Sequence, residues 1–185
     1  MKKSGVLLVA AIAVTLPAFA QRAAVSAELS PEAAGQAFRR AVIDGCVQAV
    51  TGSGVSAVAA ARDGRLQPTQ DAETRRQAGA GASETVWEVA EARGVVTVRE
   101  TAGRCVAAVY GPPSAPTIIS VAQALSTAGF EALAGAASPA GGFTQTLVGS
   151  HDGKRVTVQL VGAEPGATGN RSTFSVVTAT VFVTQ

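Results

Sequence analysis

The chain has 185 residues, of which 47% are hydrophobic, 15% charged and only 4% aromatic, with a formal net charge of +2. This length is typical of one domain with its own core, built here mainly from Val, Ala, Leu and Ile. The near-neutral charge argues against binding to nucleic acid or to an anionic membrane surface, since both need a clear excess of Lys and Arg.

The first twenty residues have the pattern of a secretory signal peptide. Lys2 and Lys3 precede an apolar run at residues 6–16, and a proline then separates this run from Ala18-Phe19-Ala20. Because a signal peptidase reads small residues at the first and third of these positions, we expect cleavage after Ala20. The apolar run is shorter than the roughly 20 residues that span a bilayer, so we expect no stable membrane insertion after cleavage.

Cleavage predicts a soluble protein that works in the periplasm or outside the cell. Position 21 is Gln, which offers no thiol for a lipid anchor. Loss of Lys2 and Lys3 lowers the 15 basic residues to 13, which equals the 13 acidic residues, so the mature chain is neutral. We expect residues 21–29 to form a flexible lead-in to a single domain at 30–185.

Cys46 and Cys105 are the only two cysteines of the chain. In an oxidising compartment two thiols are most simply explained as one disulfide. A bond between them closes a loop of roughly 60 residues, for which the chain-entropy model gives at most about 4 kcal/mol of stabilisation. A redox pair is not favoured, because catalytic dithiols are usually close together in sequence.

The mature chain begins with a predicted helix that starts at Ser30-Pro31-Glu32 and ends near Thr51-Gly52. Ser suits the cap, Pro the first turn, and Glu the positive end of the helix dipole. Small and apolar residues recur every four positions and predict one buried stripe. They are Ala34, Phe38, Val42, Cys46 and Val50.

A second, short helix is expected at residues 55–62. Residues 63–83 are polar and rich in Gly, which predicts a surface connection with a helical turn at 71–76. Val-rich segments with alternating residue types then occupy 84–90, 95–100 and 104–110, separated by short Gly-containing turns. This pattern predicts a three-stranded antiparallel meander.

The second half of the chain repeats this order of elements. A helix is expected at residues 114–128, a short segment of undecided structure at 130–133 and a loop of small residues at 134–142. Three strands follow at 143–150, 155–161 and 172–183, and Asp152-Gly153 is a strong signal for a tight hairpin turn. The fold class is therefore α+β, a single domain in the order α-βββ-α-βββ, with an antiparallel sheet, or two three-stranded meanders, and two principal helices packed on one face.

The sequence contains no recognisable catalytic, cofactor-binding or metal-binding constellation. His151 is the only histidine, and its neighbours Ser150 and Asp152 lie on the same tight turn, so a catalytic triad is not expected there. We expect an exposed turn residue with no carboxylate and hydroxyl arranged around it. Four glutamates in or beside the first meander would have to converge in a cleft to act as a carboxylate pair. They are Glu84, Glu88, Glu91 and Glu100.

Four residues form a candidate binding surface. Trp87 and Tyr110 are the single tryptophan and tyrosine of the chain, and such residues often anchor interfaces. A lone Trp among valines is more often a core residue, and that is the favoured interpretation of Trp87. Arg75 and Arg76 belong to the predicted surface connection and are the second part of this candidate surface.

Three functions are compatible with these features. The favoured one is a non-enzymatic exported protein that binds a protein or an envelope component in the periplasm and needs no cofactor. The alternative is a carrier of an apolar small molecule between the sheet and the helices, which requires a pocket of several hundred Å³ there. The least favoured is a hydrolase that uses carboxylates.

Overall fold

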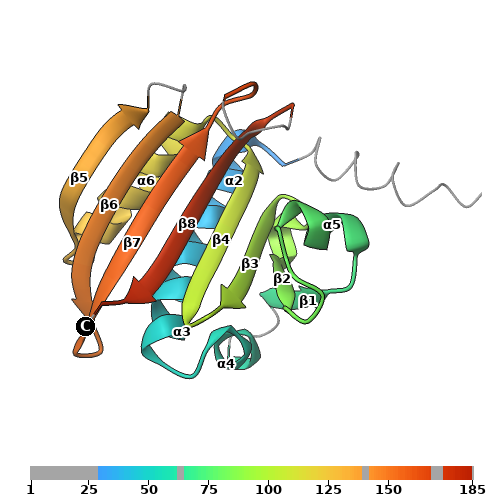
Figure 1. Ribbon diagram of the computed structural model, residues 1–185, viewed down its shortest axis with the longest axis horizontal. Coiled ribbons are helices and arrows are strands. Elements are labelled where there is room, and N and C mark those ends of the chain that lie inside the picture. Colours follow the sequence, from blue (N-terminus) through green and yellow to red (C-terminus); the bar gives the residue numbers. More distant parts are fainter. Residues whose placement is uncertain (1–28, 62–64, 139–141, 168–172, 185) are drawn as a thin grey trace, which may run out of the picture.

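The computed structural model describes residues 29–61, 65–138, 142–167 and 173–184. The predicted signal peptide at 1–20 and almost all of the predicted lead-in at 21–29 lie outside the described residues. The described elements form an α+β fold in which one antiparallel sheet of eight strands is backed by helices (Figure 1). The strand order is β1-β2-β3-β4-β8-β7-β6-β5.

The first helix is continuous over three segments, α2 (Pro31–Arg40), η1 (Ala41–Val47) and α3 (Gln48–Thr51). Ser30 caps it as predicted, because its side-chain oxygen accepts from the Ala33 N–H at 3.1 Å. The segment η1 is a π-helix, which the sequence did not reveal. In an α-helix a stride of four residues drifts by about 40° per step, and the wider π turn offsets that drift. Ala34, Phe38, Val42 and Cys46 therefore all stay buried on one side.

The short helix α4 (Val55–Ala61) follows as predicted. The expected connection at 63–83 is only partly correct. It contains the predicted helical turn as α5 (Ala72–Gln77), but also an unforeseen strand, β1 (Leu66–Thr69). β1 contains Pro68, and a proline is tolerated there because β1 is an edge strand.

The first predicted meander is present as β2 (Val86–Val89), β3 (Val96–Thr101) and β4 (Arg104–Gly111), with the 3-10 turn η2 (Ala90–Ala92) after β2. The second predicted helix is α6 (Ser114–Thr127). The second group of strands is β6 (Gly142–His151), β7 (Lys154–Ala163) and β8 (Ser175–Val183). Asp152 and Gly153 both have positive φ, which fits the predicted hairpin turn.

The prediction of a loop at 134–142 is wrong for residues 134–138, because β5 (Glu131–Ser138) pairs antiparallel with β6. Ala and Gly have weak β-propensity, so pairing with a neighbouring strand, not local preference, makes this segment extended. Residues 139–141 lie outside the described residues. Of the two predicted arrangements, one antiparallel sheet or two meanders, the structure has the single sheet, and with eight strands it is larger than the six strands expected. β4 pairs with β8 along its full length from Arg104 to Gly111, which joins both halves into one sheet.

The first helix and α6 lie on one face of this sheet. The first helix contacts β3, β4 and β8, and α6 contacts β5 to β8. Alternate residues of β4, β7 and β8 point into this layer, and Cys105, Val158 and Ala179 are fully buried there. The predicted disulfide between Cys46 and Cys105 is present, with the two Cα atoms 5.2 Å apart.

Candidate functional site

No described element covers the central strands on the face of the sheet opposite the first helix and α6. Figure 1 looks onto this face, with α2 and α6 behind the strands and α5 beside β2 and β3. The pairing register places one residue of each central strand in each row across the sheet. Two neighbouring rows make up what we call the open-face patch. The first row is Ala108, Thr178, Val161 and Thr144, and the second is Val106, Thr180, Gln159 and Thr146.

No member of the open-face patch is charged. Val161 is 48% exposed, an unusual value for a valine in the middle of a sheet. Flanking rows extend the uncharged area with Val148, Val176 and Phe182. Strands are about 4.8 Å apart and same-face residues about 6.8 Å apart, so the four strands and two rows of the open-face patch span about 260 Å² of the sheet.

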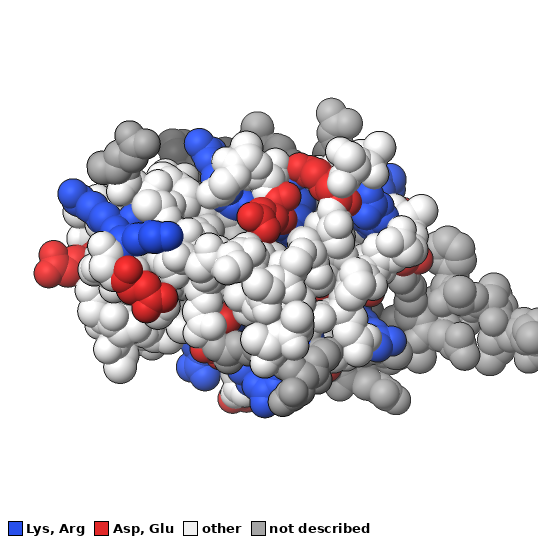
Figure 2. All heavy atoms as spheres, turned by 90° about the horizontal axis from the view of Figure 1, so that it is seen from below, with Lys and Arg blue, Asp and Glu red and all other residues white. Residues whose placement is uncertain are grey.

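Basic side chains border the patch. Arg99 pairs across the sheet with Val106, and its guanidinium lies 3.3 Å from the Glu84 carboxylate. The guanidinium of Arg104 lies over the ring of Phe182, 5.3 Å from its centroid. Figure 2 shows acidic and basic side chains interspersed among uncharged ones at one end of the molecule. Arg99 and Arg104 thus border the uncharged patch on its β3–β4 side, and polar rims are common in protein interfaces.

Trp87 lies in the core, 7% exposed, on the helix side of β2. It is therefore removed from the candidate binding surface, and the favoured interpretation as a core residue is correct. Tyr110 lies at the end of β4 on the open face, where its hydroxyl donates to the Gln77 carbonyl oxygen at 3.0 Å. Burial raises the pKa of Tyr110 above its ordinary value. This contact attaches the end of α5 to the sheet.

The two arginines of α5 do not act as a pair. Arg75 points back to its own loop and donates to the carbonyl oxygens of Gly81 and Ala82 at 3.1 and 3.2 Å. Arg76 is exposed and forms an ion pair with Glu73 one turn earlier. Arg75 thus stabilises the loop after α5. Neither of these contacts brings an arginine to Trp87 or Tyr110.

His151 is less isolated than the sequence suggested. Its side chain is 36% exposed, and Nε2 lies 3.6 Å from Asp152 Oδ2. The same carboxylate oxygen lies 3.5 Å from Thr51 Oγ1, and Lys154 Nζ donates to the Thr51 carbonyl oxygen at 2.7 Å. A carboxylate and a hydroxyl are therefore near His151, which corrects that expectation. The reason is that the hairpin packs onto the end of the first helix, where the lysine ammonium meets the helix's terminal carbonyls.

A groove of about 490 Å³ lies beside this hairpin and is lined by the end of the first helix, α4, His151 and Asp152. A second groove of about 410 Å³ lies between the first turns of α2 and α6, where Pro112, Pro113 and Pro116 form one wall. Both grooves lie on the helix side of the molecule.

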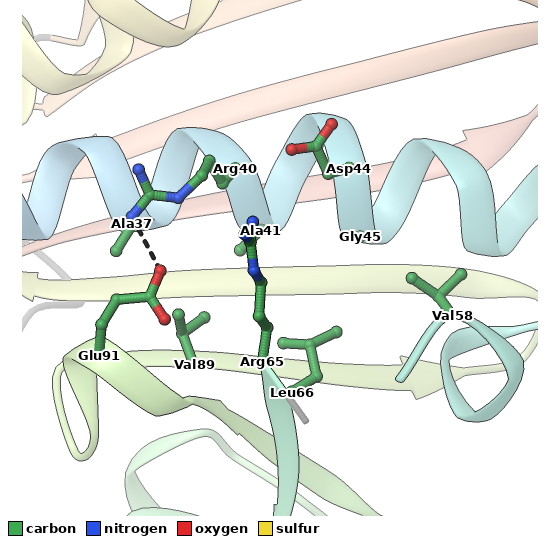
Figure 3. A pocket seen from close by; sticks show the side chains of 10 residues that line it. All are labelled: Ala37, Arg40, Ala41, Asp44, Gly45, Val58, Arg65, Leu66, Val89 and Glu91. Atoms are coloured by element: carbon green, nitrogen blue, oxygen red, sulfur yellow. Dashed lines mark hydrogen bonds and ion pairs between the residues drawn. The ribbon is translucent and has the colours of Figure 1, made fainter. Parts of the chain in front are cut away.

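The space between the first helix and the sheet is much smaller. Figure 3 shows a pocket between α2, η1 and the β1–β2 edge, bordered by the ion pair of Arg40 and Glu91 at 2.8 Å. Its volume is about 30 Å³, which holds about two water molecules. This is far below the several hundred Å³ that a carrier of an apolar molecule requires.

Each of the four glutamates in or beside the first meander binds a different partner. Glu84 accepts from the Gly81 N–H at 2.8 Å, and this bond, with that from Thr101 and the charge of Arg99, lowers the pKa of Glu84. Glu88 accepts from Gly94 at 2.8 Å, and Glu100 accepts from the Val55 N–H at the start of α4 at 3.0 Å. With Glu91 bound to Arg40, these carboxylates do not converge in one cleft.

Among the described residues, no three His, Cys, Asp or Glu side chains gather in a way that could hold a metal ion. None of the helices in these residues combines the length and hydropathy needed to cross a bilayer. Comparisons of the chain with family models, with curated proteins and with solved structures find no match. The open-face patch is the feature that sequence reasoning missed. Alternation along each strand separates the two faces, but it does not say which face the helices leave uncovered.

Proposed function

We propose that this protein is exported after removal of residues 1–20 and binds a protein partner in the periplasm through the open-face patch, without catalysing a reaction. The observation that carries the proposal is the uncharged, uncovered area over β4, β8, β7 and β6. At about 260 Å², it has the size of the central part of a standard interface, to which each partner contributes roughly 800 Å².

The chemistry of the patch favours a protein over a small molecule. Its residues are short, mostly Thr and Val, so they form a surface without a deep hollow for a ligand. Threonine hydroxyls both donate and accept hydrogen bonds, and the valines provide apolar contact. Arg104 at the rim favours a partner with an acidic border. The pocket of about 30 Å³ gives no support to the alternative of a small-molecule carrier.

Site-specific photo-crosslinking in cells tests this proposal with a matched control. Val161 on the patch and Ile119 on α6 are each 48% exposed, so they differ mainly in the face on which they lie. A photoreactive residue at position 161 should give an adduct with a partner protein, and the same residue at position 119 should give none. Equal adducts at both positions, or an adduct with glycan or lipid only, would contradict the proposal.

Export is tested on the same preparations. Mass spectrometry of protein recovered from the periplasm should give Gln21 as the first residue, because cleavage is expected after Ala20. Protein that is found only in the cytoplasm, or that retains Met1 after export, would contradict this part of the proposal.

A further inference from the structure

The two edges of the sheet differ in how well they are protected against pairing with another strand. The β1 edge has only four residues and contains Pro68, two features by which proteins block edge pairing. The β5 edge has eight residues, and no described element pairs with its outer side. Its outward backbone N–H and C=O groups are therefore available at the spacing of a further strand.

The composition of β5 offers little protection. Glu131 is its single charged residue, and residues 132–138 contain neither a charge nor a proline. Leu133 is 63% exposed, the largest value among the exposed large hydrophobic residues. One irregularity of register separates Ala132 from Ala134, after which residues 134–138 pair regularly with β6. A regular, uncharged edge of five residues thus follows the bulge.

We propose that β5 pairs antiparallel with β5 of a second copy of this chain and so forms a symmetric dimer. A strand that is paired antiparallel with itself needs no second sequence, because the same residues serve both sides of a twofold interface. Pairing centred on Ala136 sets residues 134–138 against their own copies. Glu131 then lies outside the paired segment, so like charges do not face each other.

The twofold axis of such a pair is perpendicular to the sheet. Rotation about this axis keeps the helices of both copies on one side and both uncovered faces on the other. The result is one continuous sheet of sixteen strands with two open-face patches side by side (eight strands from each copy). The dimer does not rest on the proposed function, because it uses only the backbone of the edge strand.

Light scattering and sedimentation of the purified, disulfide-bonded mature protein over a range of concentrations measure the dimer directly. The test variant carries Ala136→Lys, which sets a positive charge against its own copy across the twofold axis, and Ala134→Lys, which adds a second positive charge on the same face of the strand. We expect its dimer dissociation constant to rise about tenfold or more, since opposed like charges destabilise strand pairs. Circular dichroism of the variant should match that of the parent, because lysine is a common residue at sheet edges.

A second variant is a matched control. Gln159→Lys with Val161→Lys adds the same two charges at the same spacing, but on β7, two strands away from the edge. It should leave the dimer intact and abolish the partner adduct of a photoreactive residue at Thr178, the neighbour of Val161 in the same row, whereas the β5 variant should do the reverse. The two proposals can therefore fail independently.

Three outcomes would overturn the β5 dimer. One is a parent protein that stays monomeric at every concentration. Another is a dimer that the β5 lysines leave unchanged or that the β7 lysines disrupt equally. The third is a photoreactive residue at Leu133 that captures a different protein and no second copy of this chain, which would assign the edge to a heterologous strand.

Discussion

Cys46 and Cys105 join the middle of the first helix to strand β4, and both residues are fully buried. The bond therefore crosses the interface between the helix layer and the sheet. It links η1, whose π-helical turn keeps Cys46 on the inner side, to the strand at which the two halves of the sheet meet.

This bond should be complete in the exported protein. Alkylation under denaturing conditions without reductant should label neither thiol, and reduction before alkylation should expose both. Replacement of both residues by Ala should lower the free energy of unfolding by up to about 4 kcal/mol, because the unfolded chain loses a constraint on a loop of roughly 60 residues. A freely labelled Cys105 in the native exported protein would show that the bond does not form.

Helix α6 has an unusual cap that should make stability depend on pH. Pro113 precedes its first turn and offers no side-chain cap, and the Glu164 carboxylate takes that place. It accepts from the Ser114 N–H at 2.9 Å and from the hydroxyls of Ser114 and Ser175. These bonds, first of all that from the Ser114 hydroxyl, lower the pKa of Glu164.

A lowered pKa in the folded state means that the ionised carboxylate stabilises the fold. This contribution is fully present above the ordinary glutamate pKa of about 4.3 and is lost as pH falls through the lower folded value. Glu164→Gln should therefore cost about 1 kcal/mol at pH 7, a typical value for a lost cap, and progressively less in acid. Chemical unfolding of both proteins at several pH values measures this difference. A difference that stays constant down to pH 3 would contradict the assigned role.

The sequence predicted the elements that have a local pattern, such as a buried helix stripe or alternation along a strand. It did not predict the structure where pairing between segments far apart in the sequence determines it. The buried stripe of the first helix places Cys46 inward, and alternation on β4 places Cys105, Ala107 and Val109 on one face, so the disulfide could be inferred. No local pattern of Ala and Gly distinguishes β5 from a loop. The pairing of β4 with β8 joins residues more than 60 positions apart in the sequence. Neither strand contains a local pattern that identifies the other as its pairing partner.

Gly162 and Gly35 should respond in opposite ways to replacement by alanine, because only Gly162 is closely packed. A Cβ atom on Gly162 of β7 would lie 2.6 Å from Ser114 Cβ and 2.9 Å from Ile118 Cδ1, so α6 approaches β7 only because this residue has no side chain. A Cβ atom on Gly35 in α2 would have no atom within 4 Å.

Gly162→Ala should therefore destabilise the protein by about 1–3 kcal/mol, as overpacking does. Gly35→Ala should stabilise it by about 0.5–1 kcal/mol, since alanine is the better helix former. Denaturant unfolding of both variants checks the opposite signs. A neutral Gly162 variant would mean that α6 lies farther from β7 than described here.

Trp87 and His151 should respond in opposite ways to removal of their side chains. Trp87 packs in the core between the helices and the sheet, and Trp87→Ala should cost about 3–5 kcal/mol of unfolding free energy through lost burial and a cavity. His151 is partly exposed, and the contact that holds its hairpin to the helix end comes from Lys154. His151→Ala should therefore change stability by less than about 0.5 kcal/mol and leave partner binding intact.

Lys154→Ala tests whether Lys154, and not His151, attaches the hairpin to the end of the first helix. It removes the bond from the ammonium to the Thr51 carbonyl oxygen, and we expect a loss of about 0.3–1 kcal/mol, the usual range for a cation at a helix C-terminus. Thermal unfolding of the three variants gives the order Trp87, Lys154, His151 from largest to smallest effect. A His151 variant that folds normally but no longer forms the partner adduct at position 161 would place the binding site at the hairpin groove and not on the open face of the sheet.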